Sequence, residues 1–248
     1  MNERVALVTG GSRGVGREAA QLLSAAGTRV MIVARSEAEL AVVGLPYVAA
    51  DLGTAEGCAH AVAETERRLG PIDILVANHG IGSAHEKLVW EQDPKVWRET
   101  MRINLDGPFE LARLTVGGMC KRGFGRVVFT SSTAGEKAER SGSAYTASKH
   151  GVIGLARAVA QDAGPFGVTS NAVLPGWVRT DMAERSAKAE AERRGIGVEQ
   201  VWRERAAIYP PNRVLEPREV AQVIAFLCSD AAGGVSGEAI TVALGGIW

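Results

Sequence analysis

The chain has 248 residues, of which 46% are hydrophobic, 23% charged and 5% aromatic. Its 28 basic and 28 acidic residues balance, so no excess of positive charge marks a surface for nucleic acid or an anionic membrane. No apolar run approaches the roughly 18 residues that cross a bilayer, and the N-terminus has no secretory signal pattern. We therefore expect a cytoplasmic protein with neither nucleic acid nor membrane as a partner.

Short β-branched runs alternate with longer helical patterns along the chain. In chain order, the pattern predicts strands over residues 5–8, 29–34, 47–50, 72–77, 126–131, 168–174 and 239–242. It predicts helices over residues 14–26, 54–69, 94–122, 143–163, 181–194, 198–208 and 219–228, the third of them broken or bent near Gly107-Pro108. This alternation indicates one α/β domain over residues 1–248, a doubly wound parallel sheet of the Rossmann type in a three-layer α/β/α arrangement.

The cysteines and histidines show no metal-ligand spacing. The cysteines are odd in number and far apart, which is typical of reduced thiols in the cytoplasm. They are Cys58, Cys120 and Cys228, and the histidines are His60, His79, His85 and His150. The sequence therefore predicts no metal site.

A glycine-rich loop, GGSRGVG at residues 10–16, follows the first predicted strand. Glycines let the backbone approach a pyrophosphate, whose charge faces the free N–H groups of the next helix. The spacing from the strand end is G-x-x-x-G-x-G rather than the commoner G-x-G-x-x-G, and an ordinary glycine-rich turn is the alternative. The strand–loop–helix context favours a dinucleotide site.

The end of the second predicted strand indicates which dinucleotide binds. An NAD site usually has an acidic residue there to hold the ribose hydroxyls, whereas this chain has Arg35 and Ser36, with Arg13 in the glycine loop. Two guanidinium groups could bracket a 2′-phosphate. Arg35 as a solvated surface charge is the alternative, and Glu37 could reach the ribose after a small backbone shift. The pattern favours NADP(H), with NAD(H) as the second choice.

Tyr145 and Lys149 lie four residues apart on one predicted helix, so they share a helical face. A phenol titrates near pKa 10, and lowering that pKa by about three units requires roughly 4 kcal/mol of differential stabilisation. A fixed ammonium and an oxidised nicotinamide in a partly desolvated cleft could supply it. Ser132 follows a strand at its carboxyl end, where open α/β sheets bind ligands, and its hydroxyl could donate to a substrate oxygen. Ser131 is the alternative.

Together these motifs resemble the classical short-chain dehydrogenase/reductase family over essentially the whole chain. TGGSRGVG at 9–16 is similar to the family's TGxxxGxG loop, the 145–149 pair to its YxxxK, and Ser132 precedes the tyrosine by the family's usual interval. Asn104 is similar to the asparagine of the catalytic tetrad, Asp51-Leu52 to the adenine-contacting acid, and PGWVRT at 175–180 to the segment that holds the carboxamide.

The resemblance implies an NADP(H)-dependent enzyme that interconverts a ketone and a secondary alcohol. Its implied catalytic residues are Asn104, Ser132, Tyr145 and Lys149. Ser132 and Tyr145 would polarise the carbonyl, Tyr145 would donate the proton, Lys149 would hold the nicotinamide ribose, and Asn104 would anchor a water. The implied cofactor-binding residues are Gly10, Ser12, Arg13, Gly14, Val15, Gly16, Arg35, Asp51, Leu52, Asn78, Gly80, Tyr145, Lys149, Pro175, Gly176, Val178 and Thr180.

The substrate is less closely defined than the reaction. The pattern resembles 3-oxoacyl-[acyl-carrier-protein] reductases and also 3-hydroxybutyrate dehydrogenases, so an acyl thioester and a hydroxyacid are both open. The helical segment at about 181–213 is expected to form a substrate lid, with Met182, Trp202 and Tyr209 as its inner face. Candidates to meet a phosphopantetheine or carboxylate are Arg179, Arg193 and Arg194.

Three expectations remain, on His79, on assembly and on a non-catalytic alternative. His79 replaces a small residue of the family's NNAG motif, where it could fill space or contact a ligand. The apolar tail Ile247-Trp248 and the resemblance favour a homotetramer. A non-catalytic cofactor sensor is the remaining alternative, and a missing Tyr145 or Lys149 would have favoured it; both are present.

Overall fold

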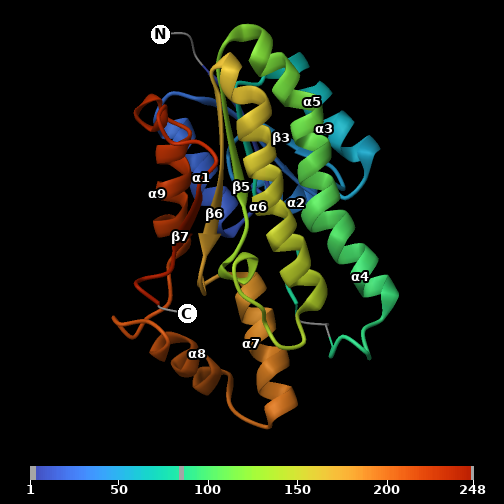
Figure 1. The fold of residues 1–248 in the computed structure, drawn as a ribbon, viewed down its shortest axis with the longest axis vertical. Helices are drawn as coiled ribbons and strands as arrows, with labels where there is room; N and C mark the ends of the chain where they lie inside the picture. The colour runs from blue at the N-terminus through green and yellow to red at the C-terminus, as the bar shows by residue number, and fades with distance from the viewer. Residues whose placement is uncertain (1–3, 84–86, 247–248) are drawn as a thin grey trace.

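A seven-stranded parallel sheet runs through the centre of the computed structural model, which describes residues 4–83 and 87–246 (Figure 1). The strands are β1 (Val5–Thr9), β2 (Arg29–Ala34), β3 (Tyr47–Ala49), β4 (Ile74–Ala77), β5 (Gly125–Thr130), β6 (Val168–Pro175) and β7 (Ala239–Val242). Their order is β3-β2-β1-β4-β5-β6-β7. This confirms the doubly wound fold, and the order reverses between β1 and β4, where such sheets bind ligands.

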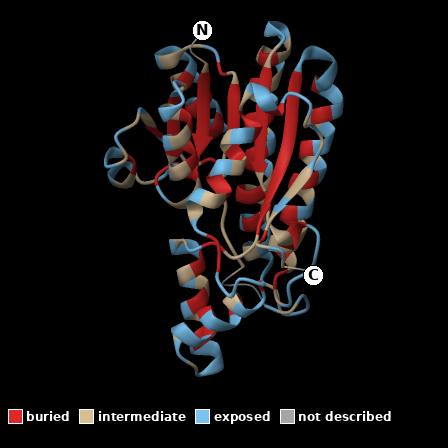
Figure 2. Cartoon of the chain, turned by 90° about the vertical axis from the view of Figure 1, so that its left-hand side faces the viewer, coloured by how far each residue is buried: buried red, intermediate tan, exposed pale blue. Residues whose placement is uncertain are grey.

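Helices cover both faces of the sheet (Figure 1). On one face lie α3 (Ala55–Leu69), α5 (Gly107–Arg122) and α6 (Ser143–Ala163), and on the other lie α1 (Gly14–Ala25), the short α2 (Glu37–Ala41) and α9 (Pro217–Leu227). The strands are apolar on both sides because both sides are covered. Leu7 packs into the core under α3 and α5, while its neighbour Val8 packs into the core under α1 and α9. Figure 2 shows the resulting buried central layer.

The long helix predicted over residues 94–122 loses its regular α-helical geometry close to the predicted position, Gly107-Pro108. There α4 (Pro94–Met101) passes through a π-helical turn, Arg102–Asp106, into α5, so the chain stays helical throughout. A proline inside a helix lacks an N–H and crowds the carbonyl four residues earlier. The wider π-helical turn accommodates this residue, and such turns occur frequently at functional sites. Here the turn carries Asn104.

Two further helix boundaries differ from the sequence pattern. The five-residue α2 was not predicted, because it is too short to show a helical period; Ser36 caps it by accepting the Glu39 N–H. Helix α9 begins two residues before its predicted start. Glu216 is its N-cap residue and forms a capping box with Glu219, and Pro217 occupies the first helical position.

Helices α7 (Asp181–Arg194) and α8 (Val198–Ala207) lie beyond the carboxyl ends of the strands (Figure 1). They have a hydrophobic cluster of their own, built on the alanine face of α7 and including Trp202 and Tyr209. These two side chains are 3% and 1% exposed. The expectation that they line the inner face of a lid is therefore wrong for both, since they form the interior of the segment itself. Met182, at 39% exposed, remains available.

Candidate active site

The ends of β1, β4 and β5 meet at the reversal point of the sheet. The Thr9 hydroxyl oxygen accepts the N–H groups of Asn78 at 2.9 Å and His79 at 3.2 Å. The Asn78 side chain donates to the Thr9 carbonyl at 3.2 Å and accepts the Thr130 hydroxyl at 3.2 Å. Asn78 thus fastens three strand ends together at the switch point of the sheet, outside which such sheets have their ligand crevice.

The glycine loop has the shape of a phosphate cradle. Gly10 and Gly14 have φ of 63° and 55°, in the left-handed region that glycine tolerates. A Cβ on Gly16 would lie 2.3 Å from the Gly10 carbonyl oxygen, so only glycine lets α1 approach the loop. Arg13 precedes the helix in an extended conformation and its side chain does not cap it. The first N–H groups of α1 are therefore oriented for an anion, and the loop fits a dinucleotide pyrophosphate.

Two acidic residues lie beside the predicted 2′-phosphate residues. The Glu39 carboxylate accepts the Ser12 hydroxyl at 3.0 Å and the Arg13 guanidinium at 3.1 Å. Arg13 also lies 3.7 Å from Asp181, the first residue of α7. Arg35 is exposed. Glu39 was not singled out in the sequence, because an acidic residue one helical turn after a strand carries no distinctive pattern.

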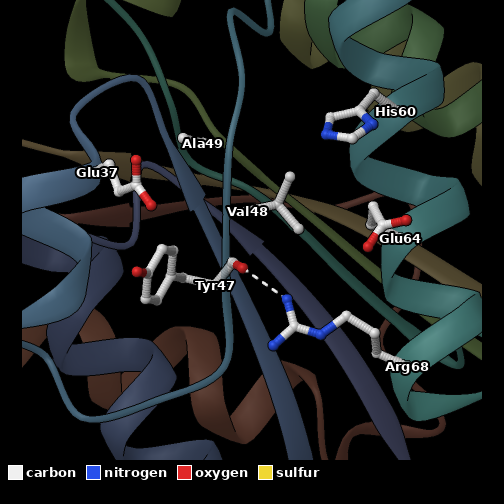
Figure 3. Close-up of a pocket in the computed structure, with 7 residues that line it drawn as sticks. All are labelled: Glu37, Tyr47, Val48, Ala49, His60, Glu64 and Arg68. Carbon is white, nitrogen blue, oxygen red and sulfur yellow. Dashed lines mark hydrogen bonds between the residues drawn. The ribbon is translucent and has the colours of Figure 1, made fainter.

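Glu37, the predicted rival for the ribose, lies elsewhere. It lines a hollow of about 390 Å³ over the edge strand β3, together with Tyr47 and residues of α3 (Figure 3). There the Arg68 guanidinium donates to the Tyr47 carbonyl at 2.8 Å, which covers part of the open sheet edge. Glu37 therefore borders this hollow, and Glu39 is the residue that reaches the glycine loop.

Asp51 lies at the predicted adenine end of the crevice. One carboxylate oxygen accepts the Gly53 N–H at 3.1 Å and the other accepts Arg102, from the π-helical turn, at 3.1 Å. Partial burial would raise the pKa of Asp51, but these hydrogen bonds outweigh it and hold the pKa below the ordinary value. Asp51 is therefore an anionic acceptor at neutral pH. The Leu52 side chain is buried in the core, and its carbonyl accepts the Cys58 thiol at 3.3 Å.

Tyr145 and Lys149 come together on α6, as their spacing predicts. The Lys149 ammonium lies 5.7 Å from the centroid of the Tyr145 ring and donates to the Thr130 carbonyl at 2.9 Å. Lys149 is 5% exposed, and this burial lowers its pKa to about 8. A cation close to a phenol favours the phenolate form. The pair can thus carry proton transfer near neutral pH.

The two candidate serines have different environments. Ser131 is buried, and its hydroxyl donates to the Lys149 carbonyl at 2.8 Å. Ser132 is half-buried in the loop after β5 and accepts the Ala134 N–H at 3.1 Å. Because an accepting hydroxyl keeps its own proton for donation, Ser132 is the better placed to donate to a substrate oxygen.

Asn104 is buried beneath the crevice. Its carbonyl oxygen accepts the Ile81 N–H at 2.8 Å, and its amide nitrogen donates to the Ile81 carbonyl at 3.0 Å and the Ser148 hydroxyl at 3.2 Å. A Cβ on Gly80 would lie 3.1 Å from the Asn104 oxygen and 3.5 Å from the Lys149 ammonium. Asn104 therefore anchors the loop that passes over Lys149.

The predicted carboxamide segment leaves the end of β6. Val178 bridges to Leu215, and the Thr180 hydroxyl caps α7 by accepting the Ala183 N–H at 3.3 Å. A Cβ on Gly14 would lie 3.3 Å from a methyl carbon of Thr180. Thr180, at the end of this segment, therefore lies against the glycine loop.

His79 fills the space next to this crevice. Its Nδ1 lies 2.8 Å from the Thr9 hydroxyl, and a Cβ on Gly107 would lie 2.7 Å from its Nε2. Burial of the ring, reinforced by the nearby Lys149 charge, lowers the pKa of His79 to about 4. The imidazole is thus neutral and links the end of β1 to the first turn of α5.

Two of the three arginines expected to meet an acidic substrate have partners within the protein, and the third, Arg193, is exposed on α7. The Arg194 guanidinium pairs with Glu190 at 2.8 Å and Glu204 at 2.6 Å. The Arg179 guanidinium stacks over the Trp202 ring at 4.3 Å. Met182 faces the crevice side, since a Cβ on Gly82 would lie 3.6 Å from its sulfur.

The described part of the chain shows no metal-binding cluster, no membrane-spanning helix and, at Cys58 and Cys228, no reactive thiolate. Residues 4–83 and 87–246 contain no group of three or more His, Cys, Asp or Glu side chains that could hold a metal, and within them no helix is long and apolar enough to span a membrane. Burial raises the pKa of Cys58 and of Cys228 to about 12, so both are thiols rather than nucleophilic thiolates. His85 and the Ile247-Trp248 tail lie outside the described residues.

Comparison with known proteins agrees with this geometry. A family model described as "Enoyl-(Acyl carrier protein) reductase" matches residues 10–246. The acetoacetyl-CoA reductase of Rhizobium meliloti is 37% identical over 243 residues, covering 96% of each protein. The D-beta-hydroxybutyrate dehydrogenase of Cupriavidus necator is 34% identical, covering 96% of this chain and 95% of that protein. A crystal structure of an actinorhodin polyketide ketoreductase variant with NADPH has a TM-score of 0.92 and 32% identity, covering 99% of this chain and 98% of that chain.

The chain belongs to the short-chain dehydrogenase/reductase family. It is an oxidoreductase that acts on ketone and alcohol groups. The family and reaction class indicated by the sequence motifs are confirmed.

Proposed function

We propose that this protein is an NADP(H)-dependent ketoreductase of 3-oxoacyl thioesters. The observation that carries the proposal is the buried Lys149 ammonium 5.7 Å from the Tyr145 ring centroid, at the carboxyl edge of the sheet. The glycine cradle and the uncapped start of α1 fit the dinucleotide. When bound, NADP(H) supplies or accepts the hydride.

The chain's own residues provide positioning and the proton. Tyr145 donates its phenolic proton to the substrate oxygen, and Ser132 donates a hydrogen bond to that same oxygen. Lys149 holds the nicotinamide ribose and stabilises the phenolate that Tyr145 becomes. Both amide N–H groups of Asn104 are engaged with Ile81 and Ser148. We therefore expect its main-chain carbonyl, rather than its amide, to hold the water that connects Lys149 with solvent.

The preference for NADP(H) rests on positive charge and on similarity. Arg13 in the glycine loop and the exposed Arg35 after β2 are the two guanidinium groups expected to bracket the 2′-phosphate, and a relative of known structure at 32% identity is described with NADPH. At the other end of the cofactor, Asp51 and the Leu52 backbone would contact adenine, and Pro175, Gly176, Val178 and Thr180 would hold the carboxamide.

The substrate class rests on the relatives and on the shape of the lid. The relative with 37% identity is an acetoacetyl-CoA reductase. Helices α7 and α8 lie beyond the strand ends and would form the lid, with Met182 toward the substrate. A second candidate is an NAD-dependent 3-hydroxyacid dehydrogenase; the Glu39 carboxylate beside Arg13 favours it, as does the similarity to a hydroxybutyrate dehydrogenase.

Assembly and location form part of the proposal. The tetramer is implied by the resemblance to the family, and exposed aromatic side chains are present on both helical layers, Trp97 on α4, Phe109 on α5 and Phe226 on α9. We propose a homotetramer in the cytoplasm, where the free thiols of Cys58, Cys120 and Cys228 would stay reduced.

Loss of reduced-nicotinamide absorbance tests the function directly. Acetoacetyl-CoA and free acetoacetate would each be supplied with NADPH and with NADH, using wild-type protein and Tyr145→Phe. We expect turnover with acetoacetyl-CoA and NADPH, and a loss of at least about a hundredfold in kcat for the variant. The matched control is Tyr47→Phe on the sheet edge, which should keep wild-type activity. Turnover only with acetoacetate and NADH would favour the second candidate, and tight NADPH binding without turnover would indicate a sensor.

A further inference from the structure

The backbone of residue 177 is held by a buried tyrosine from the α7–α8 segment. Tyr209, two residues after α8, accepts the Trp177 N–H at 2.7 Å through its phenolic oxygen. The ring is 1% exposed. A Cβ on Gly176 would lie 2.3 Å from that oxygen, and a Cβ on Gly246 would lie 2.8 Å from the ring. The absence of a side chain at Gly176 and Gly246 therefore leaves room for the Tyr209 ring, and any side chain at either position would collide with it.

A second residue of α8 holds the side chain of the same residue. The Arg205 guanidinium stacks over the Trp177 ring at 3.6 Å. It also donates to the Ala183 carbonyl at 3.0 Å and to Glu190 at 3.0 Å, both on α7. Trp177 is therefore held through its N–H by Tyr209 and through its ring by Arg205. Both of these residues belong to the α7–α8 segment and not to the sheet.

On its opposite side this loop forms a short parallel bridge with Leu215, which lies just before α9. The Trp177 carbonyl accepts the Leu215 N–H at 2.9 Å, and the Arg179 N–H donates to the Leu215 carbonyl at 2.8 Å. The loop at Trp177–Arg179 thus pairs with Leu215 on one side, as neighbouring strands do, and with the Tyr209 hydroxyl on the other. Loss of the hydroxyl would leave the N–H of the Gly176–Trp177 peptide without its partner, while the next peptide, between Trp177 and Val178, stays paired with Leu215.

We propose that Tyr209 is a positioning residue that couples the α7–α8 segment to the orientation of the nicotinamide, by fixing the Gly176–Trp177 peptide through its phenolic oxygen. This rests on the proposed function, in which residues 175–180 hold the cofactor carboxamide. The adenosine half of the cofactor binds across the sheet reversal, on the glycine loop and Asp51, and does not depend on this contact. Burial raises the pKa of Tyr209, so its phenol stays neutral.

The test compares two ligands that differ by the nicotinamide half. Dissociation constants for NADPH and for 2′,5′-ADP would be measured by calorimetry on wild-type protein and Tyr209→Phe, which keeps the ring between the glycines. Leaving one buried N–H unpaired should weaken NADPH binding about tenfold and change 2′,5′-ADP binding by less than about twofold. The control is Tyr47→Phe on β3, at the opposite edge of the sheet, which should change neither constant.

A second variant keeps the test independent of how well the first one folds. Gly176→Ala pushes against the same oxygen from the loop side and should give the same selective loss of NADPH affinity. If the hydroxyl and the loop act as a unit, the double variant should bind NADPH no more weakly than Gly176→Ala alone.

Equal weakening of both ligands in Tyr209→Phe would show general loosening and overturn the proposal, as would unchanged NADPH affinity. Wild-type protein that bound neither ligand would instead refute the proposed cofactor site, a result that no Tyr209 variant could produce.

Discussion

The Glu39 carboxylate binds the Arg13 guanidinium at 3.1 Å and, through its second oxygen, the Ser12 hydroxyl at 3.0 Å. Arg13 is one of the two arginines predicted to bracket a 2′-phosphate, and Ser12 is predicted to bind the cofactor in the same loop. The Glu39 carboxylate occupies the Ser12 and Arg13 donors when no cofactor is bound, and its negative charge would repel the 2′-phosphate of NADP(H). Glu39 is therefore expected to reduce the preference for NADP(H) over NAD(H) that two arginines would otherwise give.

Replacing Glu39 by glutamine should raise the affinity for NADPH and leave that for NADH unchanged. The side chains of Glu39 and Arg13 are 43% and 45% exposed, so solvent screens the pair and we expect a gain of about three- to tenfold. Titration of each dinucleotide by nicotinamide fluorescence measures it. Glu37→Gln, on the same short helix but facing the sheet edge, serves as the matched control. Weaker NADPH binding in Glu39→Gln would mean that Glu39 instead holds Arg13 in its binding position.

His79 should make the protein less stable in mild acid. Because burial lowers its pKa to about 4, the unfolded chain binds more protons than the folded one as the pH falls from the ordinary histidine value toward 4. Stability is thus lost over that window, by about 2 kcal/mol between about pH 7.5 and pH 5. Urea unfolding at fixed protein concentration should show this loss in wild-type protein and in His60→Ala, an exposed control. In His79→Ala this part of the pH dependence should vanish, whatever its absolute stability; its persistence would contradict the assignment.

Arg205 should contribute more to stability than any surface arginine of the same helix. Its guanidinium is 4% exposed, stacks on Trp177 and pairs with Glu190 at 3.0 Å. Arg205→Met would leave one oxygen of Glu190 and the Ala183 carbonyl without their donor, while the other Glu190 oxygen stays paired with Arg194, and we expect a cost of about 2 kcal/mol. Arg203→Met, exposed on α8, should cost little. Thermal unfolding followed by tryptophan fluorescence reports the difference, and equal effects in the two variants would refute it.

Gly16→Ala should abolish dinucleotide binding without unfolding the protein. The added Cβ would lie 2.3 Å from the Gly10 carbonyl oxygen, so the loop must move away from the helix and the phosphate cradle opens. We expect at least about a hundredfold loss of NADPH affinity, because the backbone donors no longer converge on the pyrophosphate. Gly197→Ala, where a Cβ meets no atom within 4 Å, is the control. Retained affinity in Gly16→Ala would exclude this loop as the phosphate site.

Local patterns of the chain were enough to predict the sheet and the family. The inner strands β1, β2, β4, β5 and β6 have cores buried on both faces, and the glycine loop, Tyr145 and Lys149 all follow rules of spacing within one element. A strand–loop–helix unit and two residues four apart on a helix are short-range geometry. The sequence therefore indicated the fold, the family and the crevice in which a dinucleotide would bind.

Contacts between distant segments could be decided only by the tertiary structure. Glu39 meets Arg13 and Tyr209 meets Trp177 across 26 and 32 positions of the chain, and neither pair has a periodic pattern. The π-helical turn at Asn104 also escaped prediction, since it arises where Pro108 must be accommodated within a continuous helix. Trp202 and Tyr209 looked like a ligand-facing surface because aromatic side chains at helical spacing do not specify what they pack against. Packing of α7 on α8 decided that they face inward.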